Sequence, residues 1–156
     1  MKFKLVEKFN RNLFINESED KSFVDKKHKQ NGYKKLTNFN FYTTQNNDEG
    51  KSYNLYWTDE NNNLVCKVTV DSIPASDGYK WFGNLEVAKS YRGYDLGNQI
   101  IDLIVNKYKA GALAVHKDNQ IAYKLYKNHG FEIGPYNGRD KDYYYMYLKN
   151  NKIVGR

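Results

Sequence analysis

Apolar and polar residues alternate along the first half of the chain, beginning near residue 38. The alternating runs have a period of two and are separated by short polar segments, most of which contain Gly or Pro. They cover residues 39–43, 53–57, 65–70 and 81–87. A period of two places side chains on alternate faces of a strand, and polar turns separate consecutive strands. This half of the chain is therefore predicted to form an antiparallel meander.

The apolar spacing lengthens to three or four residues after residue 95, which predicts a helix with one buried face. The residues with this spacing are Leu96, Ile100, Leu103, Ile104 and Tyr108. Lys107 and Lys109 would lie near the negative end of the helix dipole, where positive charge is favourable. Gly111 follows them and is the predicted stop.

A short apolar run at residues 113–115 predicts a strand that is buried on both faces. A second helical pattern follows, with Asp118 or Asn119 as its N-cap and Gly130 as its end. Its buried stripe is predicted to contain Ala122, Leu125, Tyr126 and His129. Two last strands are expected at residues 131–133 and 143–148.

A meander followed by strand, helix and strand predicts an α/β or α+β fold, in which helices flank a mixed sheet. The length of 156 residues suits a single domain covering residues 1–156. Residues 37–150 form its recognisable core. Residues 1–36 form a variable N-terminal segment, in which residues 2–9 are compatible with a first strand. Residues 17–35 are strongly charged, and a solvated helix face or loop is a simpler interpretation of them than a nucleic-acid patch.

The bulk properties limit the function only loosely. The formal net charge of +7 favours the capture of anions, which include coenzyme A and nucleic acid. Cys66 is the only cysteine and lies in an alternating pattern, so a buried structural role is expected. The three histidines have no spacing that would form a metal site with it. The chain has neither a membrane-spanning segment nor a secretory signal, and a cytoplasmic protein is expected.

The segment after residue 85 has the arrangement of an anion site. A strand containing Leu85-Glu86-Val87 leads through a loop that opens with Arg92-Gly93 and closes with Gly97, and the loop passes directly into the predicted helix. Backbone N–H groups and the positive end of the helix dipole then face the same point. The loop has neither the Gly-Lys-Ser/Thr of a Walker A loop nor the glycine spacing of a Rossmann fingerprint.

These residues resemble the Gcn5-related N-acetyltransferases. In that family a strand, a diphosphate-binding loop and a helix are followed by a second half that carries an Asn, an Ala, a Leu-Tyr pair and a Gly-Phe pair. The second half is represented here by Asn119, Ala122, Leu125-Tyr126 and Gly130-Phe131. The resemblance covers about the last two thirds of the chain. It implies a mostly antiparallel sheet with one parallel, splayed strand pair, and acetyl-CoA as co-substrate without a metal.

The resemblance also implies roles for individual residues. Tyr126 matches the tyrosine that protonates the leaving thiolate, and phenols and thiols are of similar acidity. Packing under its helix is the competing interpretation for this tyrosine. Asn119 matches an asparagine that contacts the pantetheine arm and can also be a helix cap. The other cofactor-binding residues implied are Leu85, Val87, Arg92, Gly93, Tyr94, Asp95, Leu96, Gly97 and Asn98.

Asp95 departs from the family pattern, which has glycine at this position. Its carboxylate would place a negative charge near a diphosphate, which Arg92 and Lys89 would partly offset. The simplest structural role for Asp95 is that of N-cap to the helix starting at Leu96. A cap would use the N–H groups that a phosphate needs, so either the carboxylate turns outward or cofactor binding is weakened.

The catalytic base is less clear from the pattern. Many relatives have a Glu in the second strand, where this chain has Ala114. Glu86, on the strand before the loop, is the nearest alternative, although it could also be a surface residue. His116 and a chain of water molecules are further alternatives.

The expected function is transfer of an acetyl group from acetyl-CoA to a primary amine by direct attack. The acceptor is open between a small molecule, a protein and aminoacyl-tRNA, and a homodimer is compatible with the sequence. A non-catalytic binding or inhibitor module with the same fold is one alternative. An RNA-directed acetyltransferase and a nucleic-acid binder are the others.

Overall fold

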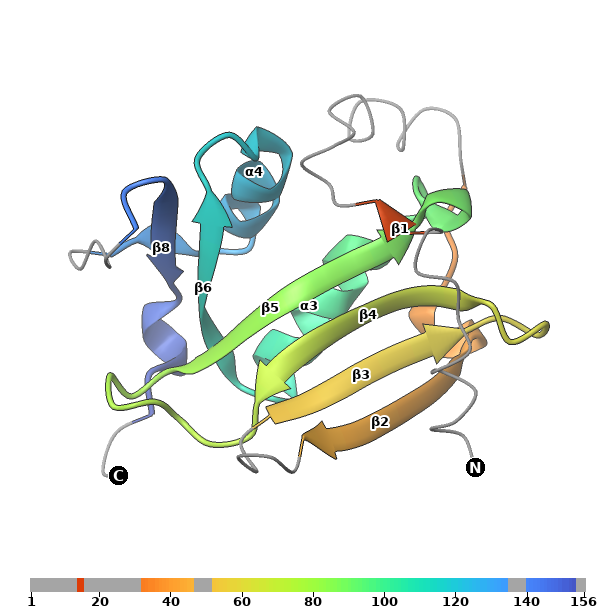
Figure 1. The fold of residues 1–156 in the computed structure, drawn as a ribbon, viewed down its shortest axis with the longest axis horizontal. Coiled ribbons are helices and arrows are strands. Elements are labelled where there is room, and N and C mark those ends of the chain that lie inside the picture. Colours follow the sequence, from red (N-terminus) through yellow and green to blue (C-terminus); the bar gives the residue numbers. More distant parts are fainter. Residues whose placement is uncertain (1–13, 16–31, 47–51, 135–139, 154–156) are drawn as a thin grey trace.

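The computed structural model describes residues 14–15, 32–46, 52–134 and 140–153 (Figure 1). The strand expected at residues 2–9 and most of the charged segment at 17–35 lie outside the described residues. Within the described ranges, eight strands form a single sheet. The strands are β1 (Phe14–Ile15), β2 (Asn40–Asn46), β3 (Ser52–Thr58), β4 (Leu64–Asp71), β5 (Lys80–Ala88), β6 (Ala110–His116), β7 (Glu132–Ile133) and β8 (Tyr143–Tyr147).

Strands β2 to β5 form the predicted antiparallel meander, and the whole sheet has the order β2-β3-β4-β5-β6-β8-β7. The central strand β4 is buried almost throughout, so its alternating sequence packs against neighbours on both faces. Beyond the meander, β6 pairs in parallel with β5 and antiparallel with β8. The predicted mixed sheet with one parallel pair is therefore confirmed.

The parallel pair of β5 and β6 is short. Its register contains only Lys80 with Ala110 and Trp81 with Ala112, at the beginning of both strands. In Figure 1 the two ribbons start close together and then separate toward their ends. The splayed strand pair that the family resemblance implies is therefore present.

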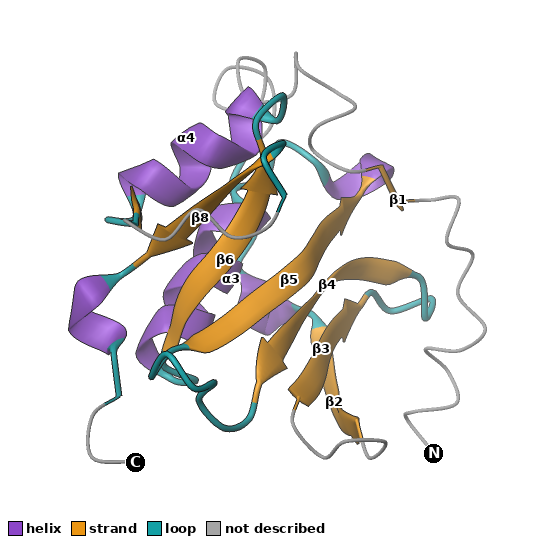
Figure 2. Cartoon of the chain, turned by 60° about the vertical axis from the view of Figure 1, so that its left-hand side comes forward, coloured by secondary structure: helices purple, strands orange, loops and turns teal. Residues whose placement is uncertain are grey.

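Two α-helices and three 3₁₀ turns accompany the sheet in the described part of the chain: α3 (Leu96–Asn106), α4 (Gln120–Asn128), η3 (Leu36–Asn38), η4 (Lys89–Tyr91) and η5 (Lys149–Asn151). Figure 2 shows α3 lying across one face of the sheet. Its residues Ile100, Ile101 and Ile104 are completely buried in the core, together with Val68 of β4. This burial of the apolar stripe is the main stabilisation of a helix of this length.

Several local predictions differ from the structure. Helix α3 ends at Asn106, and the chain turns through Lys109, whose φ is 63°, so Gly111 lies inside β6 and is not the stop. Ala114 is exposed, so the end of β6 is not buried on both faces. Gln45 and Asn46, expected in a turn, extend β2.

The second helix follows its predicted signals. The Asn119 side chain accepts a hydrogen bond from the Ala122 N–H at 3.0 Å, which identifies Asn119 as the N-cap. Gly130 follows the last turn with a φ of 96°, a conformation that glycine adopts without strain. Neither of the two α-helices that the structure describes is long and apolar enough to cross a membrane.

Candidate functional site

The backbone conformation of the loop between β5 and α3 explains why the similar family has glycines in this loop. Gly93 has a φ of 88°, and Asp95 has a φ of 68° and a ψ of 21°, which is the left-handed region. Glycine adopts this region freely, and aspartate tolerates it better than most other residues. The aspartate in place of the family glycine therefore keeps the loop conformation that glycine would have.

Asp95 is the N-cap residue of the helix starting at Leu96, as predicted, but the expected side-chain cap is absent. The Asp95 side chain makes no capping hydrogen bond. Its Oδ1 instead accepts a hydrogen bond of 2.7 Å from Nδ2 of Asn98, one turn into the helix. The carboxylate is thus directed along the helix surface, away from the backbone amides at the helix start.

The first amides of α3 are consequently available to a ligand. Among the described residues, no acceptor is present for the backbone N–H groups of Leu96, Gly97 and Asn98; the next N–H, of Gln99, donates to the Asp95 carbonyl oxygen at 3.4 Å. Adjacent free N–H groups at the positive end of a helix are an anion site. This geometry fits the diphosphate of coenzyme A.

Two side chains anchor the loop to the sheet. The Arg92 side chain is buried, with 6% exposure, and its Nε donates to the carbonyl oxygen of Val87 at 3.2 Å. The Tyr91 hydroxyl donates to Oδ2 of Asp59, in the turn between β3 and β4, at 2.6 Å. Burial, together with this hydrogen bond, raises the pKa of Tyr91 to about 12. Burial acts to raise the pKa of Asp59, but the hydrogen bonds from Tyr91, Asn63 and Asn61 outweigh it and the net shift is downward.

Strand β5 contains an irregularity that the sequence analysis missed. Its pairing with β4 shifts by one residue between Lys67–Glu86 and Thr69–Gly83, and Asn84 has a φ of 57°. An extra residue of this kind is a β-bulge, which bends a strand and redirects its N–H groups. The unusual φ occurs at an Asn, which tolerates it, so alternation of apolar residues alone gave no signal.

The edge of β5 that faces β6 is divided into three parts. Lys80 and Trp81 pair with β6, whereas Val87 and Ala88 pair with Ile15 and Phe14 of β1. Residues 82–86 between them have no strand partner on this edge among the described residues. Of the backbone segment expected to hold the thioester, Leu85 lies in this open part and Val87 is paired with β1.

Tyr126 lies beside this part of β5. Its ring is in edge-to-face contact with Phe82, with 5.8 Å between ring centroids, and with Phe131 at 6.4 Å. The residue is 9% exposed. Phe82 directly follows the last residue of β5 that pairs with β6, so the ring lies where the two strands separate. Tyr126 therefore packs into the core and at the same time lies beside the splayed region.

The base candidates are placed differently from one another. Glu86 is half-buried and lies directly opposite Lys67 across β4 and β5. The His116 side chain is 42% exposed, and its Nδ1 accepts a hydrogen bond from the Asp118 N–H at 3.1 Å. Cys66 is completely buried, and burial raises the pKa of its thiol well above the usual value, so a nucleophilic role is excluded.

A side-chain contact between the two helices was not predicted. His129, the C-cap of α4, places Nε2 at 2.8 Å from Oδ1 of Asn98 and Nδ1 at 3.2 Å from Oδ1 of Asp102. The spacing of Asn98 and Asp102, four residues apart on one helix face, was the available signal. Because Asn98 also binds Asp95, this contact joins the end of α4 to the loop.

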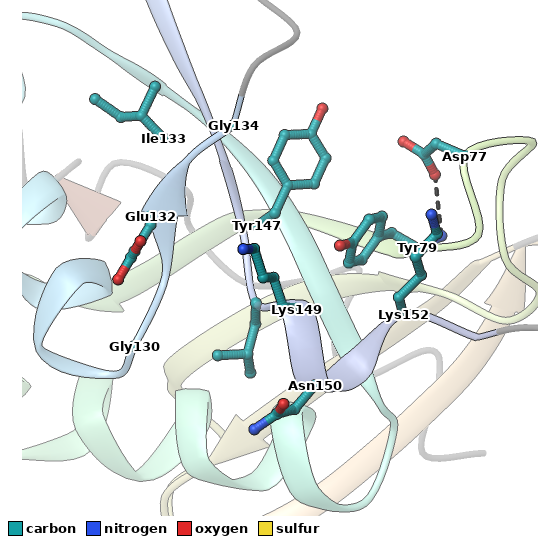
Figure 3. A pocket seen from close by; sticks show the side chains of 11 residues that line it. Asp77, Tyr79, Gly130, Glu132, Ile133, Gly134, Tyr147, Lys149, Asn150 and Lys152 are labelled. Carbon is teal, nitrogen blue, oxygen red and sulfur yellow. Dashed lines mark hydrogen bonds between the residues drawn. The ribbon is translucent and has the colours of Figure 1, made fainter.

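A large recess lies elsewhere on the molecule and contains none of the predicted site residues. It has a volume of about 620 Å³, and Figure 3 shows Tyr79, Tyr147 and Lys149 among the side chains that line it. Tyr79 immediately precedes β5, whereas the loop follows the other end of this strand of nine residues. Such a strand spans roughly 30 Å, so Tyr79 lies far from the loop, although Gly130, which also lines the recess, directly follows His129.

Comparisons with known proteins agree with this geometry. The profile of the Acetyltransferase (GNAT) family matches residues 13–131. No curated protein matches the chain. Three similar solved structures are a chimera of the Vibrio cholerae spermidine N-acetyltransferase SpeG and hSSAT (TM-score 0.50, 21% identity, 64% of this chain and 68% of that chain), the dodecameric spermidine N-acetyltransferase from Vibrio cholerae (0.50, 21%, 65% and 66%), and the Campylobacter jejuni N-acetyltransferase PseH (0.46, 25%, 65% and 70%).

Proposed function

Because the chain belongs to the GNAT family of acetyltransferases, and is therefore an acyltransferase, we propose that it transfers the acetyl group of acetyl-CoA to a primary amine. The amine attacks the thioester directly, without an acyl-enzyme. The buried Cys66 offers no accessible nucleophile for a covalent route. Acetyl-CoA supplies an activated acyl group and a thiol leaving group.

The observation that carries this proposal is the free amide cluster at the start of α3. An aspartate at position 95 would be expected to occupy these amides, yet its carboxylate is bound to Asn98. The backbone N–H groups of Leu96, Gly97 and Asn98 are therefore free to hold a diphosphate. Gly93 and Tyr94, which precede Asp95 in the loop, are the further residues proposed to contact the cofactor beside these N–H groups.

The chemistry is then assigned to residues along β5 and α4. The open edge of β5, residues 82–86, receives the pantetheine arm as an additional strand, and a backbone N–H at or near Leu85 stabilises negative charge on the thioester oxygen. Glu86 accepts the proton of the amine, directly or through water. Tyr126 donates its hydroxyl proton to the departing thiolate. Asn119 contacts the arm while it caps α4.

The acceptor is proposed only as a primary amine. Spermidine is the substrate named for two of the similar solved structures, and at 21% identity that similarity concerns the fold. Polyamines therefore belong in a panel of acceptors together with peptides and aminoacyl-tRNA, and the panel decides between them.

The proposal is tested by the release of free thiol from acetyl-CoA with each acceptor in turn. Saturable binding of CoA by calorimetry, together with amine-dependent thiol release, would support the proposal. CoA binding without thiol release for any acceptor would indicate a non-catalytic module. Absence of CoA binding, with or without binding of RNA, would contradict the proposal altogether.

A further inference from the structure

A continuous chain of four side chains connects the cofactor loop to the end of α4. Asp95 Oδ1 is 2.7 Å from Asn98 Nδ2, Asn98 Oδ1 is 2.8 Å from His129 Nε2, and His129 Nδ1 is 3.2 Å from Asp102 Oδ1. The His129 side chain is 15% exposed, whereas that of Asp102 is 66% exposed. The histidine is therefore held between α4 and α3 and is largely shielded from solvent.

The direction of each hydrogen bond follows from the groups involved. A carboxylate accepts only, so Asn98 must present its NH₂ group to Asp95 and its oxygen to His129. His129 must then donate from Nε2. Donation from Nδ1 to Asp102 as well requires the doubly protonated ring. Each of these side chains thus determines how the next one in the hydrogen-bonded series is oriented.

We propose that His129 is a positioning residue for the cofactor loop: by fixing the side-chain amide of Asn98, it keeps the Asp95 carboxylate off the backbone amides that bind the diphosphate. This inference rests on the function proposed above. The competing position of the carboxylate is that of a capping aspartate, which accepts from the second or third N–H of the helix and typically has an extended backbone, so Asp95 would have to leave its left-handed conformation to adopt it. Without a fixed Asn98, one restraint against that rearrangement is lost, and a capping carboxylate would exclude the anion.

The proposal explains why an aspartate is compatible with this loop. The left-handed backbone at Asp95 satisfies the loop conformation, and Asn98, which is held by His129, donates a hydrogen bond to the carboxylate. A glycine would need no such chain, because it has no carboxylate to restrain. The effect of His129 on cofactor binding should therefore depend on the presence of Asp95.

A double-mutant cycle with calorimetric CoA binding tests this dependence. His129→Leu should raise the Kd for CoA about fivefold, the equivalent of one lost hydrogen bond or cap. His129→Gln, whose terminal NH₂ replaces the Nε2 donor, should restore most of the affinity, and His129→Asn should not. In an Asp95→Gly background, His129→Leu should leave the Kd unchanged.

The outcomes separate the two proposals. If the parent protein does not bind CoA, the proposed function fails. If the parent binds and His129→Leu binds equally well, the positioning role alone is wrong. An equal loss of affinity with and without Asp95 would assign His129 a general structural role and would also overturn the proposal. Thermal unfolding shows whether each variant is folded. Recovery of CoA affinity in His129→Gln then shows that the loss in His129→Leu comes from a weakened site and not from misfolding.

Discussion

The ring of Tyr126 on α4 packs edge-to-face against Phe82 on β5, with 5.8 Å between the ring centroids. This contact fixes the helix against the strand at the point where β5 and β6 separate. It depends on the ring alone, so the hydroxyl can be removed without disturbing it. Tyr126→Phe should therefore lower kcat about 100-fold or more, the usual contribution of a general acid, while the variant remains folded.

The matched control is Tyr123→Phe on the same helix, whose ring packs on Tyr144. This variant should keep the parental kcat. Thiol-release kinetics with saturating acetyl-CoA provide the measurement for both. A Tyr126→Phe variant that turns over at the parental rate would exclude Tyr126 as the acid.

Removal of the Asp95 charge should strengthen cofactor binding. Asp95→Gly adopts the left-handed backbone freely, and Asp95→Asn tolerates it while retaining a polar side chain. Both should lower the Kd for CoA severalfold, because a carboxylate close to a diphosphate is repulsive even in a screened environment. Calorimetric titration measures the change, and an unchanged Kd in both variants would mean that the diphosphate does not bind at this loop.

Asn119 is expected to have two separable effects. Asn119→Ala removes the N-cap of α4 and should lower the free energy of unfolding by about 1 kcal/mol. Asn119→Asp retains a capping oxygen and should recover that stability. If Asn119 also contacts the pantetheine arm, neither variant will recover the parental Kd for CoA. Recovery of both quantities in the Asp variant would limit Asn119 to the capping role.

Glu86→Gln should slow the reaction. The change removes a proton acceptor, so kcat should fall by about 100-fold. Glu132→Gln, on the exposed strand β7, is the matched control and should keep the parental kcat. A parental kcat in Glu86→Gln would transfer the role to His116 or to water.

The hydrogen bond between Tyr91 and Asp59 should make stability depend on alkaline pH. The pKa of Tyr91 is raised from 10.0 to about 12 in the folded protein, so its contribution is complete below pH 10 and is lost as the pH rises through 12. Tyr91→Phe should lower the free energy of unfolding at pH 8 by about 1 kcal/mol. That difference from the parent should shrink between pH 10 and pH 12.

Denaturant unfolding at several pH values measures this difference directly. Tyr33→Phe, at a tyrosine that is 61% exposed, provides the control and should match the parent at every pH. If the difference in free energy of unfolding between Tyr91→Phe and the parent stays constant up to pH 12, the hydrogen bond to Asp59 does not govern the titration of Tyr91.

The sequence by itself determined the features that depend on neighbouring residues. Alternation predicted the strands β2 to β5, the spacing from Leu96 predicted α3, and Asp118 or Asn119, with Gly130, marked the two ends of α4. Periodicity reports which side chains face the core, and caps act within one helical turn, so both signals are contained in short windows. The loop proposed to bind the diphosphate was recognisable for the same reason, since its strand, turn and helix are consecutive.

The tertiary structure alone decided the contacts between residues that are far apart in the chain. Asn98, the partner of the Asp95 carboxylate, is also bonded to His129, which is 31 residues further on. The pairing of β1 with Val87 and Ala88 of β5, and the bulge at Asn84, likewise depend on which strands become neighbours. Even Gly111, a stop signal by its local context, is part of β6, where its carbonyl oxygen accepts a hydrogen bond from the Leu148 N–H just beyond β8. Such outcomes follow from competition between local preference and packing over the whole chain, and no short window of sequence contains both.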